Sequence, residues 1–189
     1  LRLFAEDGLI VVEPRTIRPS AGELFRGFIE GADAIQQRLE QVSDALQEAG
    51  MEPLAELRHL RCDLSSPPPH SETPWTFVQA DQRPKHDLME VIERTYEGTL
   101  DCPRLTGLRS MQDVLASHKT TGIYTPRWWW LAQRKEILAG CILTNRTTNP
   151  SCAELVYTGV VPDFRREGLG RAMLTWCAQR IRGDGMRWL

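Results

Sequence analysis

Residues 160–170 read VVPDFRREGLG, and this stretch decides how the surrounding chain folds. It follows an apolar run, CAELVYTG, that is typical of a β-strand and is interrupted by one charged residue, Glu154. The segment after it, RAMLTWCAQRIR, has apolar residues at helical spacing. The stretch therefore places two glycines, Gly168 and Gly170, at the point where a strand turns into a helix.

A helix that begins at such a loop is predicted to bind an anion. Its first N–H groups have no partner within the helix and carry the positive end of the helix dipole. The glycines let an anionic group approach the backbone, and three arginines add positive charge: Arg165, Arg166 and Arg171. The loop lacks the Gly-Lys-Ser/Thr of a Walker A loop and the three glycines of a dinucleotide fingerprint. We therefore expect a phosphate or pyrophosphate seat that belongs to neither motif.

In its motifs this region resembles the GNAT superfamily of acyl-CoA-dependent N-acetyltransferases. The acyl-CoA loop of that family reads Arg/Gln-x-x-Gly-x-Gly/Ala, and residues 165–170 read RREGLG after the frequent Val-x-Pro at residues 160–162. The strand before the loop looks like the family's fourth strand, and the helix after it looks like the long third helix. The resemblance is best from Trp128 to Leu189. It implies an α/β fold, with a central mixed β-sheet flanked by helices.

The resemblance also implies a set of residues that bind acetyl-CoA. In the family, the amides of the loop hold the pyrophosphate, and the end of the preceding strand holds the pantetheine arm. Carried over to this sequence, the cofactor-binding residues are Val160, Val161, Arg165, Arg166, Glu167, Gly168, Leu169, Gly170 and Arg171. No metal is implied, and the four histidines show no metal-ligand spacing. His118, at the end of an expected short helix, is expected to be a partner of the helix dipole.

Glu154 matches the strand glutamate that serves as the general base in the histone-acetyltransferase branch of the family. An ammonium must lose a proton before its nitrogen attacks a thioester, so the reaction needs such a group. The alternative is a solvated strand glutamate without a catalytic role, since many members place their base elsewhere. Strand alternation would turn Tyr157, three positions later, to the opposite face, so the sequence does not favour Tyr157 as the general acid.

Four further residues are candidates for binding the amine acceptor. Tyr96, Glu97 and Asp101 fall where the family's first helix and the following loop shape the acceptor site. Trp128 would line an acceptor pocket with an aromatic face. The alternatives are ordinary exposed charges at a helix end, and a core position in the run WWW, where alternation sends Trp128 and Trp130 to one side of the sheet.

Composition excludes several classes of protein. Hydrophobic residues make up 41% of the 189 residues and charged residues 25%, which is usual for a globular protein. The formal net charge of −2 provides no basic field of the kind that nucleic-acid-binding proteins use. No apolar run approaches the roughly 20 residues of a membrane-spanning helix. The five cysteines are scattered and form no C-x-x-C pair, so we expect reduced thiols in a cytoplasmic protein.

A proline-rich segment at residues 63–74, DLSSPPPHSETP, divides the chain. We expect a first module at residues 1–64, a linker at 65–74 and an acetyltransferase domain at 75–189. The first module is expected to hold a strand (GLIVVEP), a helix from about residue 32 to residue 49, and a second strand before the linker. The domain is expected to run strand, helix, helix, three strands, helix and the start of another strand.

The end of the first module, DALQEAGMEPLAELRHL, resembles the segment that closes a GNAT domain. We therefore expect two tandem GNAT-like modules, as in mycothiol synthase, of which the first is partial, degenerate and without a cofactor loop. The family's later strands carry an Asn and the Tyr that acts as general acid. These strands would follow Leu189, so the sequence leaves the general acid unidentified and the domain without its C-terminal strands.

The residues together predict an N-acetyltransferase that moves an acetyl group from acetyl-CoA to a primary amine of a small molecule or peptide. Two alternatives from other classes stay open. One is a non-catalytic protein that binds or senses acyl-CoA through the same loop. The other is a nucleotide-binding module that uses the glycines for a different pyrophosphate. Glu154 favours catalysis over sensing, and no element that would recognise a base supports the nucleotide.

Overall fold

The chain forms two compact units, Leu1–Leu60 and Arg61–Leu189. The computed structural model describes residues 2–6, 9–13, 41–52, 60–66, 69, 72–99, 103 and 107–189, and for the first two ranges it describes the backbone alone. Among these residues, no helix has the length and apolar character that crossing a lipid bilayer requires.

The first unit contains a β-hairpin and a helical segment. Strands β1 (Arg2–Glu6) and β2 (Leu9–Glu13) pair antiparallel. The strand expected at GLIVVEP is thus confirmed as β2, whereas β1 was not expected from the sequence pattern. Residues 41–48 are helical. The earlier part of the helix expected from residue 32, and residues 53–59 of the strand expected before the linker, lie outside the described residues.

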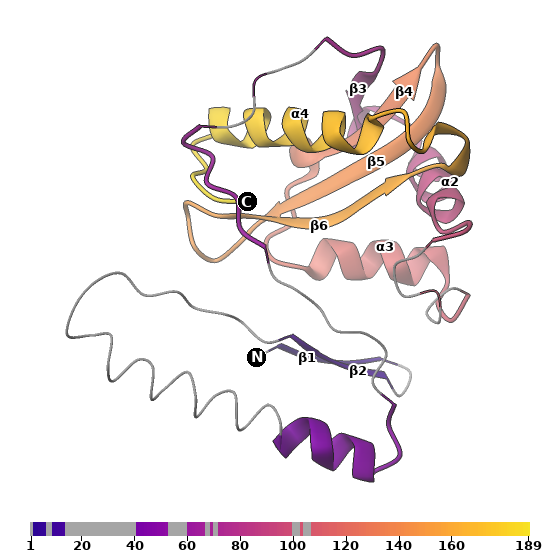
Figure 1. The fold of residues 1–189 in the computed structure, drawn as a ribbon, viewed down its shortest axis with the longest axis vertical. Coiled ribbons are helices and arrows are strands. Elements are labelled where there is room, and N and C mark those ends of the chain that lie inside the picture. The colour runs from indigo at the N-terminus through magenta and orange to yellow at the C-terminus, as the bar shows by residue number, and fades with distance from the viewer. Residues whose placement is uncertain are drawn as a thin grey trace, which may run out of the picture. The chain divides into compact units, whose positions relative to one another are not determined.

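The second unit is built on a four-stranded antiparallel sheet in the order β3-β4-β5-β6 (Figure 1). Its strands are β3 (Thr76–Gln79), β4 (Trp129–Arg134), β5 (Ile137–Arg146) and β6 (Ala153–Val160). A two-residue turn joins β4 to β5. Lys135 and Glu136 both have positive φ, 49° and 64°, which is the backbone of a tight hairpin turn that follows the twist of its strands.

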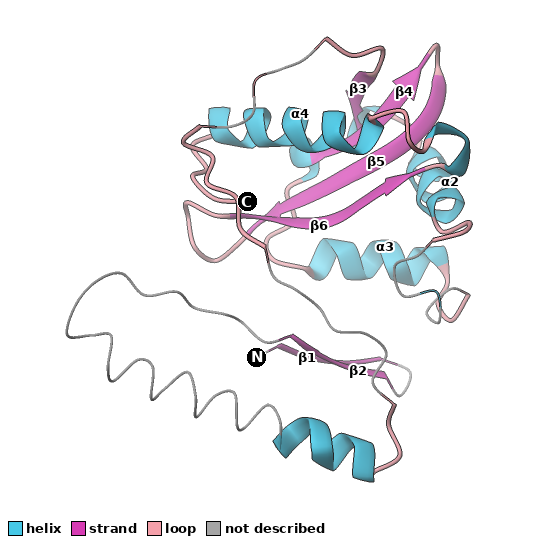
Figure 2. Ribbon diagram, viewed as in Figure 1, coloured by secondary structure: helices cyan, strands magenta, loops and turns pink. Residues whose placement is uncertain are grey.

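Three α-helices pack on this sheet: α2 (Lys85–Thr95), α3 (Met111–Thr120) and α4 (Leu169–Gly183). The side chain of Ser110 accepts a hydrogen bond from Asp113 N–H, so Ser110 is the N-cap of α3. Short 3-10 turns, η1 (Ala80–Gln82), η3 (Pro126–Trp128) and η4 (Pro162–Phe164), connect the elements. Figure 2 shows that α4 lies along the sheet and that α2 and α3 lie away from α4.

The sheet separates two apolar clusters, which show that α4 covers one face and that α2 and α3 cover the other. The α4 face holds Met173, Cys177 and Ile181 of the helix against Trp128 and Trp130. The opposite face holds Val91 and Ile92 of α2 and Val114 and Leu115 of α3, packed against Trp129 and Leu131. The expectation that Trp128 and Trp130 share one side of the sheet is therefore confirmed.

The C-terminal residues begin a further strand-like segment, as expected from MRWL. Trp188 forms a parallel bridge with Cys152 and an antiparallel bridge with Asp63. Cys62 N–H donates to Leu189 O at 2.6 Å, and Leu189 N–H donates back to Cys62 O at 3.1 Å. Both bridges are isolated and lie outside the four strands, so the described sheet is antiparallel and not mixed as the resemblance implies. Residues 61–64 thus belong to the second unit and flank its C-terminal segment.

A β-bulge in β6 changes the direction of one tyrosine. Leu143 of β5 lies opposite Tyr157, and the next residue, Thr144, lies opposite Leu155, so Val156 is an extra residue in β6. The extra residue reverses the alternation, and Tyr157 therefore points to the same face as Glu154. The prediction that Tyr157 faces away from Glu154 was wrong, because simple alternation assumes a strand without a bulge.

Candidate active site

The loop between β6 and α4 has the backbone geometry of an anion seat. Gly168 precedes the first residue of α4 and has a φ of 80° in the left-handed region. The first backbone hydrogen bond of the helix runs from Ala172 N–H to Gly168 O. The N–H groups of Leu169, Gly170 and Arg171 therefore have no partner within the helix. They point, with the positive end of the helix dipole, toward the space in front of the loop.

The two glycines of the loop keep this space open. A Cβ atom added to Gly168 would meet no other heavy atom within 4 Å. A Cβ atom added to Gly170 would approach only Val160, at 4.0 Å. Neither glycine is therefore required for packing inside the protein, and a larger side chain at either position would extend into the seat. The residues thus fit a ligand that carries a phosphate or pyrophosphate group.

Arg165 points away from the seat and toward the end of α2. Its Nε donates to Val160 O at 3.1 Å. Its Nη atoms donate to Gly98 O at 3.0 Å, Thr95 O at 3.0 Å and Glu97 O at 2.6 Å. The side chain therefore ties the loop to the carbonyl groups that end α2. Sequence reasoning assigned Arg165 to the cofactor, and the structure shows that its side chain is already bound to four carbonyl groups.

Arg166 and Arg171 are the two cations of the loop that stay available. Both side chains are exposed, and within the described part of the chain neither makes an ion pair or a side-chain hydrogen bond. Glu167, which lies between them in the sequence, is held instead by Arg134 of β4, whose Nη1 lies 2.5 Å from Oε2 of Glu167. This pairing neutralises the carboxylate of Glu167, while the other carboxylate of the loop, that of Asp163, lies 3.8 Å from Arg94 of α2.

The side chains of the remaining loop residues that the family resemblance predicts pack in or against the hydrophobic core. Leu169 and Val161 are each 1% exposed, and Leu169 belongs to the core of the α4 face. Val161 N–H donates to Ala139 O at 2.9 Å. The side chain of Val160 packs against the same core. Leu169 and Val161 can therefore meet a ligand only through main-chain groups, whereas Val160 is partly exposed.

A cavity of about 230 Å³ opens beside the loop. Its walls include Gly168, Arg171 and Glu167, and on the other side Trp75 with residues of the preceding segment such as Thr73. The anion seat thus has room next to it for the part of a ligand that extends beyond a phosphate.

The outer edge of β6 leads from the loop toward Glu154. The C-terminal segment pairs with the start of this edge: Arg187 N–H and Trp188 N–H donate to Ser151 O, and Ala153 N–H donates to Trp188 O. Across the residues that the structure describes, no strand pairs with β6 beyond Ala153 on the side away from β5. The open edge offers main-chain N–H and C=O groups to an extended ligand arm.

Glu154 lies on the face of the sheet covered by α2 and α3. It stands opposite Asn145 of β5, and its side chain is half-buried. Its carboxylate makes no hydrogen bond or ion pair within the described ranges. Glu154 is therefore placed next to the open edge of β6 with a carboxylate that is not engaged by the protein.

Asn145 is a buried polar residue that sequence reasoning missed. Its Nδ2 donates to His118 O at 2.9 Å and to Thr121 O at 2.7 Å. Its Oδ1 accepts hydrogen bonds from Trp129 Nε1 at 2.9 Å and from Thr125 N–H at 3.2 Å. The side chain is fully buried and fixes the end of α3 against the sheet. The signal that the sequence offers for this residue is a single amide, Asn145, directly after the apolar residues that begin the segment ILTNR.

Tyr157 lies at the centre of a polar and aromatic cluster near Glu154. Its hydroxyl group is 2.6 Å from Oγ1 of Thr95. Because the Thr95 hydroxyl donates to Ile92 O at 2.6 Å, Tyr157 is the donor to Thr95. The ring of His118 stacks on the ring of Tyr157, with centroids 5.2 Å apart, and Tyr96 packs against it edge to face at 5.9 Å. The cluster joins α2, α3 and β6.

His118 is neutral in this environment. Burial, together with the smaller effect of the positive charge of Arg109, lowers the pKa of its imidazole to about 4. Its Nε2 is buried and has no hydrogen-bond partner among the described residues. The expectation that His118 is a charged partner of the helix dipole was therefore wrong, because the ring turns inward onto Tyr157 instead of staying in water.

The structure gathers only some of the predicted acceptor residues. Tyr96 follows α2 and meets Tyr157 on the Glu154 face. Glu97 is exposed, and its main-chain carbonyl is bound by Arg165. Trp128 is 1% exposed and packs on the α4 face, so the sheet separates it from Glu154. Asp101 lies outside the described residues.

Two of the described cysteines, Cys141 and Cys177, are buried thiols. Burial raises the pKa of the Cys141 thiol to about 12 and that of Cys177 to about 11. Such thiols are not nucleophilic near neutral pH. In the part of the chain that the structure describes, no three His, Cys, Asp or Glu side chains are grouped to hold a metal ion.

These elements combine a helix N-terminus that can hold an anion with an open strand edge that can pair with an extended arm. A model of the acetyltransferase (GNAT) family matches residues 88–189. The chain belongs to the GNAT acetyltransferase family, and the expected fold class and family are confirmed. Curated protein sequences gave no match.

Solved structures of GNAT proteins have a similar fold. A GCN5-related N-acetyltransferase from Sphaerobacter thermophilus is 16% identical, with a TM-score of 0.52 over 88% of this chain and 59% of that chain. The ribosomal-protein-S18-alanine N-acetyltransferase from Escherichia coli is 20% identical, with a TM-score of 0.44 over 59% of this chain and 62% of that one. An N-acetylglutamate synthase from Neisseria gonorrhoeae, complexed with coenzyme A and N-acetyl-glutamate, is 19% identical. Its TM-score is 0.45, over 61% of this chain and 24% of that chain. The chain thus spans less than two thirds of the length of these proteins.

Proposed function

We propose that residues 61–189 transfer an acetyl group from acetyl-CoA to a primary amine. One observation carries the proposal. The unpartnered N–H groups at the start of α4 follow directly in the chain on β6, whose outer edge is open and which carries Glu154. A ligand with a pyrophosphate at one end and a reactive group at the end of a flexible arm fits this arrangement.

The chain's own groups supply the binding. The N–H groups of Leu169, Gly170 and Arg171 would hold the pyrophosphate, and the guanidinium groups of Arg166 and Arg171 would add charge-assisted hydrogen bonds. The main chain of Val160 and the open β6 edge would hold the pantetheine arm. Glu167 would not repel the phosphates, because Arg134 already compensates its charge.

Glu154 is the proposed general base. In the transfer, the amine nitrogen forms a bond to the acetyl carbon, and the bond between that carbon and the sulfur of coenzyme A breaks. The proton that the amine loses passes to the Glu154 carboxylate, directly or through water, and the coenzyme leaves as a thiolate that takes up a proton. The free carboxylate of Glu154 on the face next to the open edge supports this role.

The first unit is proposed to be a partial, degenerate GNAT-like module without a cofactor loop, with residues 65–74 as the linker. The likeness to the Sphaerobacter protein supports this idea, because it covers more of the chain than residues 61–189 supply. We also propose that the protein works in the cytoplasm. The described cysteines, Cys62, Cys141, Cys152 and Cys177, are all free thiols, which suits a reducing compartment.

Binding of acetyl-CoA tests the cofactor seat. A ligand that binds only the folded protein raises its stability, so acetyl-CoA should raise the Tm. The Gly170→Val variant should lose this rise, because its side chain projects into the seat while the fold leaves room for its Cβ. Gly183→Val is the matched control, since it changes a glycine at the other end of α4 that also has no close neighbour. An equal Tm rise in all three proteins would exclude this loop as the seat.

Turnover tests Glu154. Glu154→Gln should keep acetyl-CoA binding and lower kcat by roughly 10²- to 10⁴-fold, the usual share of a general base. The acidic limb of the kcat/KM profile should disappear with the carboxylate, and part of the lost rate should return at high pH. Acetyl-CoA binding without acetylation of any amine in a broad panel would instead indicate a protein that binds acyl-CoA without catalysis.

A further inference from the structure

Arg134, the last residue of β4, reaches the anion loop from outside it. Its Nη1 donates to Oε2 of Glu167 at 2.5 Å. The two residues are 33 positions apart in the chain, so the contact exists only because the fold brings the hairpin of β4 and β5 to the loop. The contact therefore ties the end of β4 to the residue that directly precedes Gly168.

Two aromatic rings hold the guanidinium group of Arg134 in place. Its Cζ atom lies 4.5 Å from the ring centroid of Trp75 and 5.3 Å from that of Phe164. These two rings pack edge to face with centroids 5.7 Å apart, and Trp75 is 4% exposed. An exposed ion pair usually contributes little, because it has to order two flexible side chains. Here the rings already order one of them, so the guanidinium is in position to hold Glu167.

Glu167 stands where a free carboxylate would oppose the proposed ligand. It directly precedes Gly168, and the unpartnered N–H groups of the helix start follow at once. Glu167, Gly168 and Arg171 all line the cavity of about 230 Å³ beside the loop. Like charges a few ångströms apart repel each other even in water. Without its partner, the carboxylate would therefore weaken the binding of a pyrophosphate at the start of α4.

Arg134 acts on this cavity through its neighbours. Of the described residues, those that line the cavity include Trp75 and Glu167 but not Arg134. Both of these wall residues are direct contacts of the Arg134 guanidinium. An effect of Arg134 on the ligand would thus pass through the position and the charge of Glu167.

We propose that Arg134 is a positioning residue that holds the carboxylate of Glu167 out of the anion seat and so sets the affinity for the anionic ligand. The inference rests on the proposed function, because the ligand is taken to be acetyl-CoA. It assigns a role in ligand binding to a residue that lies outside the loop motif of residues 165–170. The loop supplies the amide groups, and Arg134 supplies the charge that allows an acidic residue to stand within the loop.

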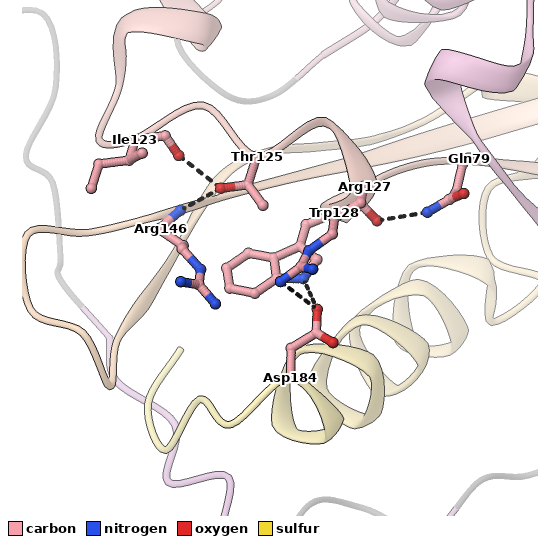
Figure 3. A network of polar contacts seen from close by, with 7 residues as sticks. All are labelled: Gln79, Ile123, Thr125, Arg127, Trp128, Arg146 and Asp184. Carbon is pink, nitrogen blue, oxygen red and sulfur yellow. Dashed lines mark hydrogen bonds and ion pairs between the residues drawn. The ribbon is translucent and has the colours of Figure 1, made fainter.

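A second arginine on the α4 face has the same surroundings and provides a matched control (Figure 3). Arg127 lies over the ring of Trp128 at 5.7 Å and pairs with Asp184 at 3.3 Å. Asp184 also accepts a hydrogen bond from Trp128 Nε1 at 2.5 Å. Asp184 follows the last residue of α4, which is about 22 Å along the helix axis from its start. Arg127→Gln therefore removes an equivalent stacked and paired guanidinium far from the loop.

Calorimetric titration of the full chain with acetyl-CoA tests the inference. Arg134→Gln should raise the Kd on the order of tenfold, because a free carboxylate then faces the pyrophosphate. Arg134→Lys keeps the positive charge without the planar fork, and its Kd should stay within about threefold of the parent value. Arg127→Gln should change the Kd less than about twofold, since its distance from the loop exceeds the Debye length of about 8 Å. Arg134 is partly exposed at the end of a hairpin, so these variants should fold.

A double variant separates this role from a general effect on the fold. In a Glu167→Gln background there is no carboxylate to hold, so adding Arg134→Gln should change the Kd less than about threefold. An arginine with only a structural role would weaken binding equally in both backgrounds. Raising the ionic strength from about 0.1 M to about 1 M shortens the Debye length from about 10 Å to about 3 Å, and it should bring the Kd of Arg134→Gln close to that of the parent.

The outcomes distinguish the inference from the proposed function. The inference is overturned by an Arg134→Gln protein that binds acetyl-CoA as the parent does, by an equal loss in Arg127→Gln, or by a loss that persists in the Glu167→Gln background or at high ionic strength. In each of these cases the parent still binds acetyl-CoA, so the proposed function stands. A parent protein that does not bind acetyl-CoA would refute the proposed function and the inference together.

Discussion

Removing the side chain of Arg165 should lower the stability of the protein far more than removing that of its neighbour. Arg165 is the only link by side-chain hydrogen bonds that the described residues provide between the anion loop and the end of α2. In Arg165→Ala, the carbonyl groups of Thr95 and Val160 would lose a donor in a part-buried setting. Those of Glu97 and Gly98 would turn to water instead.

The magnitude follows from the exposure of these four bonds. A hydrogen bond from a charged donor contributes about 1.5–3 kcal/mol when it is shielded from water, and little when it is exposed. Counting the two part-buried bonds at the lower value gives about 3 kcal/mol, to which the lost charge at the end of α2 adds less than about 1 kcal/mol. For a domain of this size, such a change lowers the Tm by roughly 10 °C.

Urea unfolding without acetyl-CoA is the appropriate assay, because it reports stability separately from ligand binding. Arg166→Ala is the control, since this arginine is adjacent, exposed and without a bond to the described protein; it should change the free energy of unfolding by less than about 0.5 kcal/mol. Arg165→Lys should restore less than half of the loss, because one ammonium cannot reach all four carbonyl groups. Similar stabilities of Arg165→Ala and Arg166→Ala would refute the reasoning.

Three further predictions concern the face that carries Glu154. Asn145→Asp should cost about 3 kcal/mol in urea unfolding, because a carboxylate there replaces two buried donors and faces two carbonyl groups; a loss under 1 kcal/mol would contradict the buried network. Lowering the pH from 7.5 to 5 should reduce the free energy of unfolding by about 2 kcal/mol through His118. The pKa of His118 is about 4 in the folded protein and lies below the unfolded value, so the neutral imidazole stabilises the fold fully above pH 6.5. That stabilisation is lost as the pH falls toward 4. A His118→Gln protein should lack this pH-dependent part, and the same slope in both proteins would assign it to other groups. Gly159→Ala should lose about 1–3 kcal/mol, since its Cβ would stand 2.7 Å from Oγ1 of Thr95 and 2.8 Å from the hydroxyl of Tyr157; the Gly170→Ala protein, whose Cβ has room, should stay within about 0.5 kcal/mol of the parent by thermal unfolding.

Local patterns were sufficient for most of the second unit. The helical spacing of Leu88, Val91 and Ile92, and the apolar runs on either side of Lys135 and Glu136, fixed the element types before any contact was known. They could do so because the period of apolar residues depends on the backbone of each element alone. The anion loop was predicted for the same reason, since a helix N-terminus and its glycines act within about six residues.

The orientation of Tyr157 could not be predicted in that way. It depends on one extra residue in β6, and a bulge is defined only by the pairing of two strands. The inward turn of His118 likewise depends on the ring of Tyr157, which lies 39 positions later in the chain and meets it only because α3 packs on the sheet.

The sequence by itself determined that a glycine-containing loop with several arginines joins a strand to a helix, and that this loop resembles a GNAT acyl-CoA loop. Only the tertiary structure decided which arginines serve it. Arg165 is bound to the end of α2, whereas Arg166 and Arg171 are left to water. The physical reason is that a guanidinium pairs with whatever acceptors the fold brings within reach, and the carbonyl groups at the end of α2 lie about 70 residues earlier in the chain.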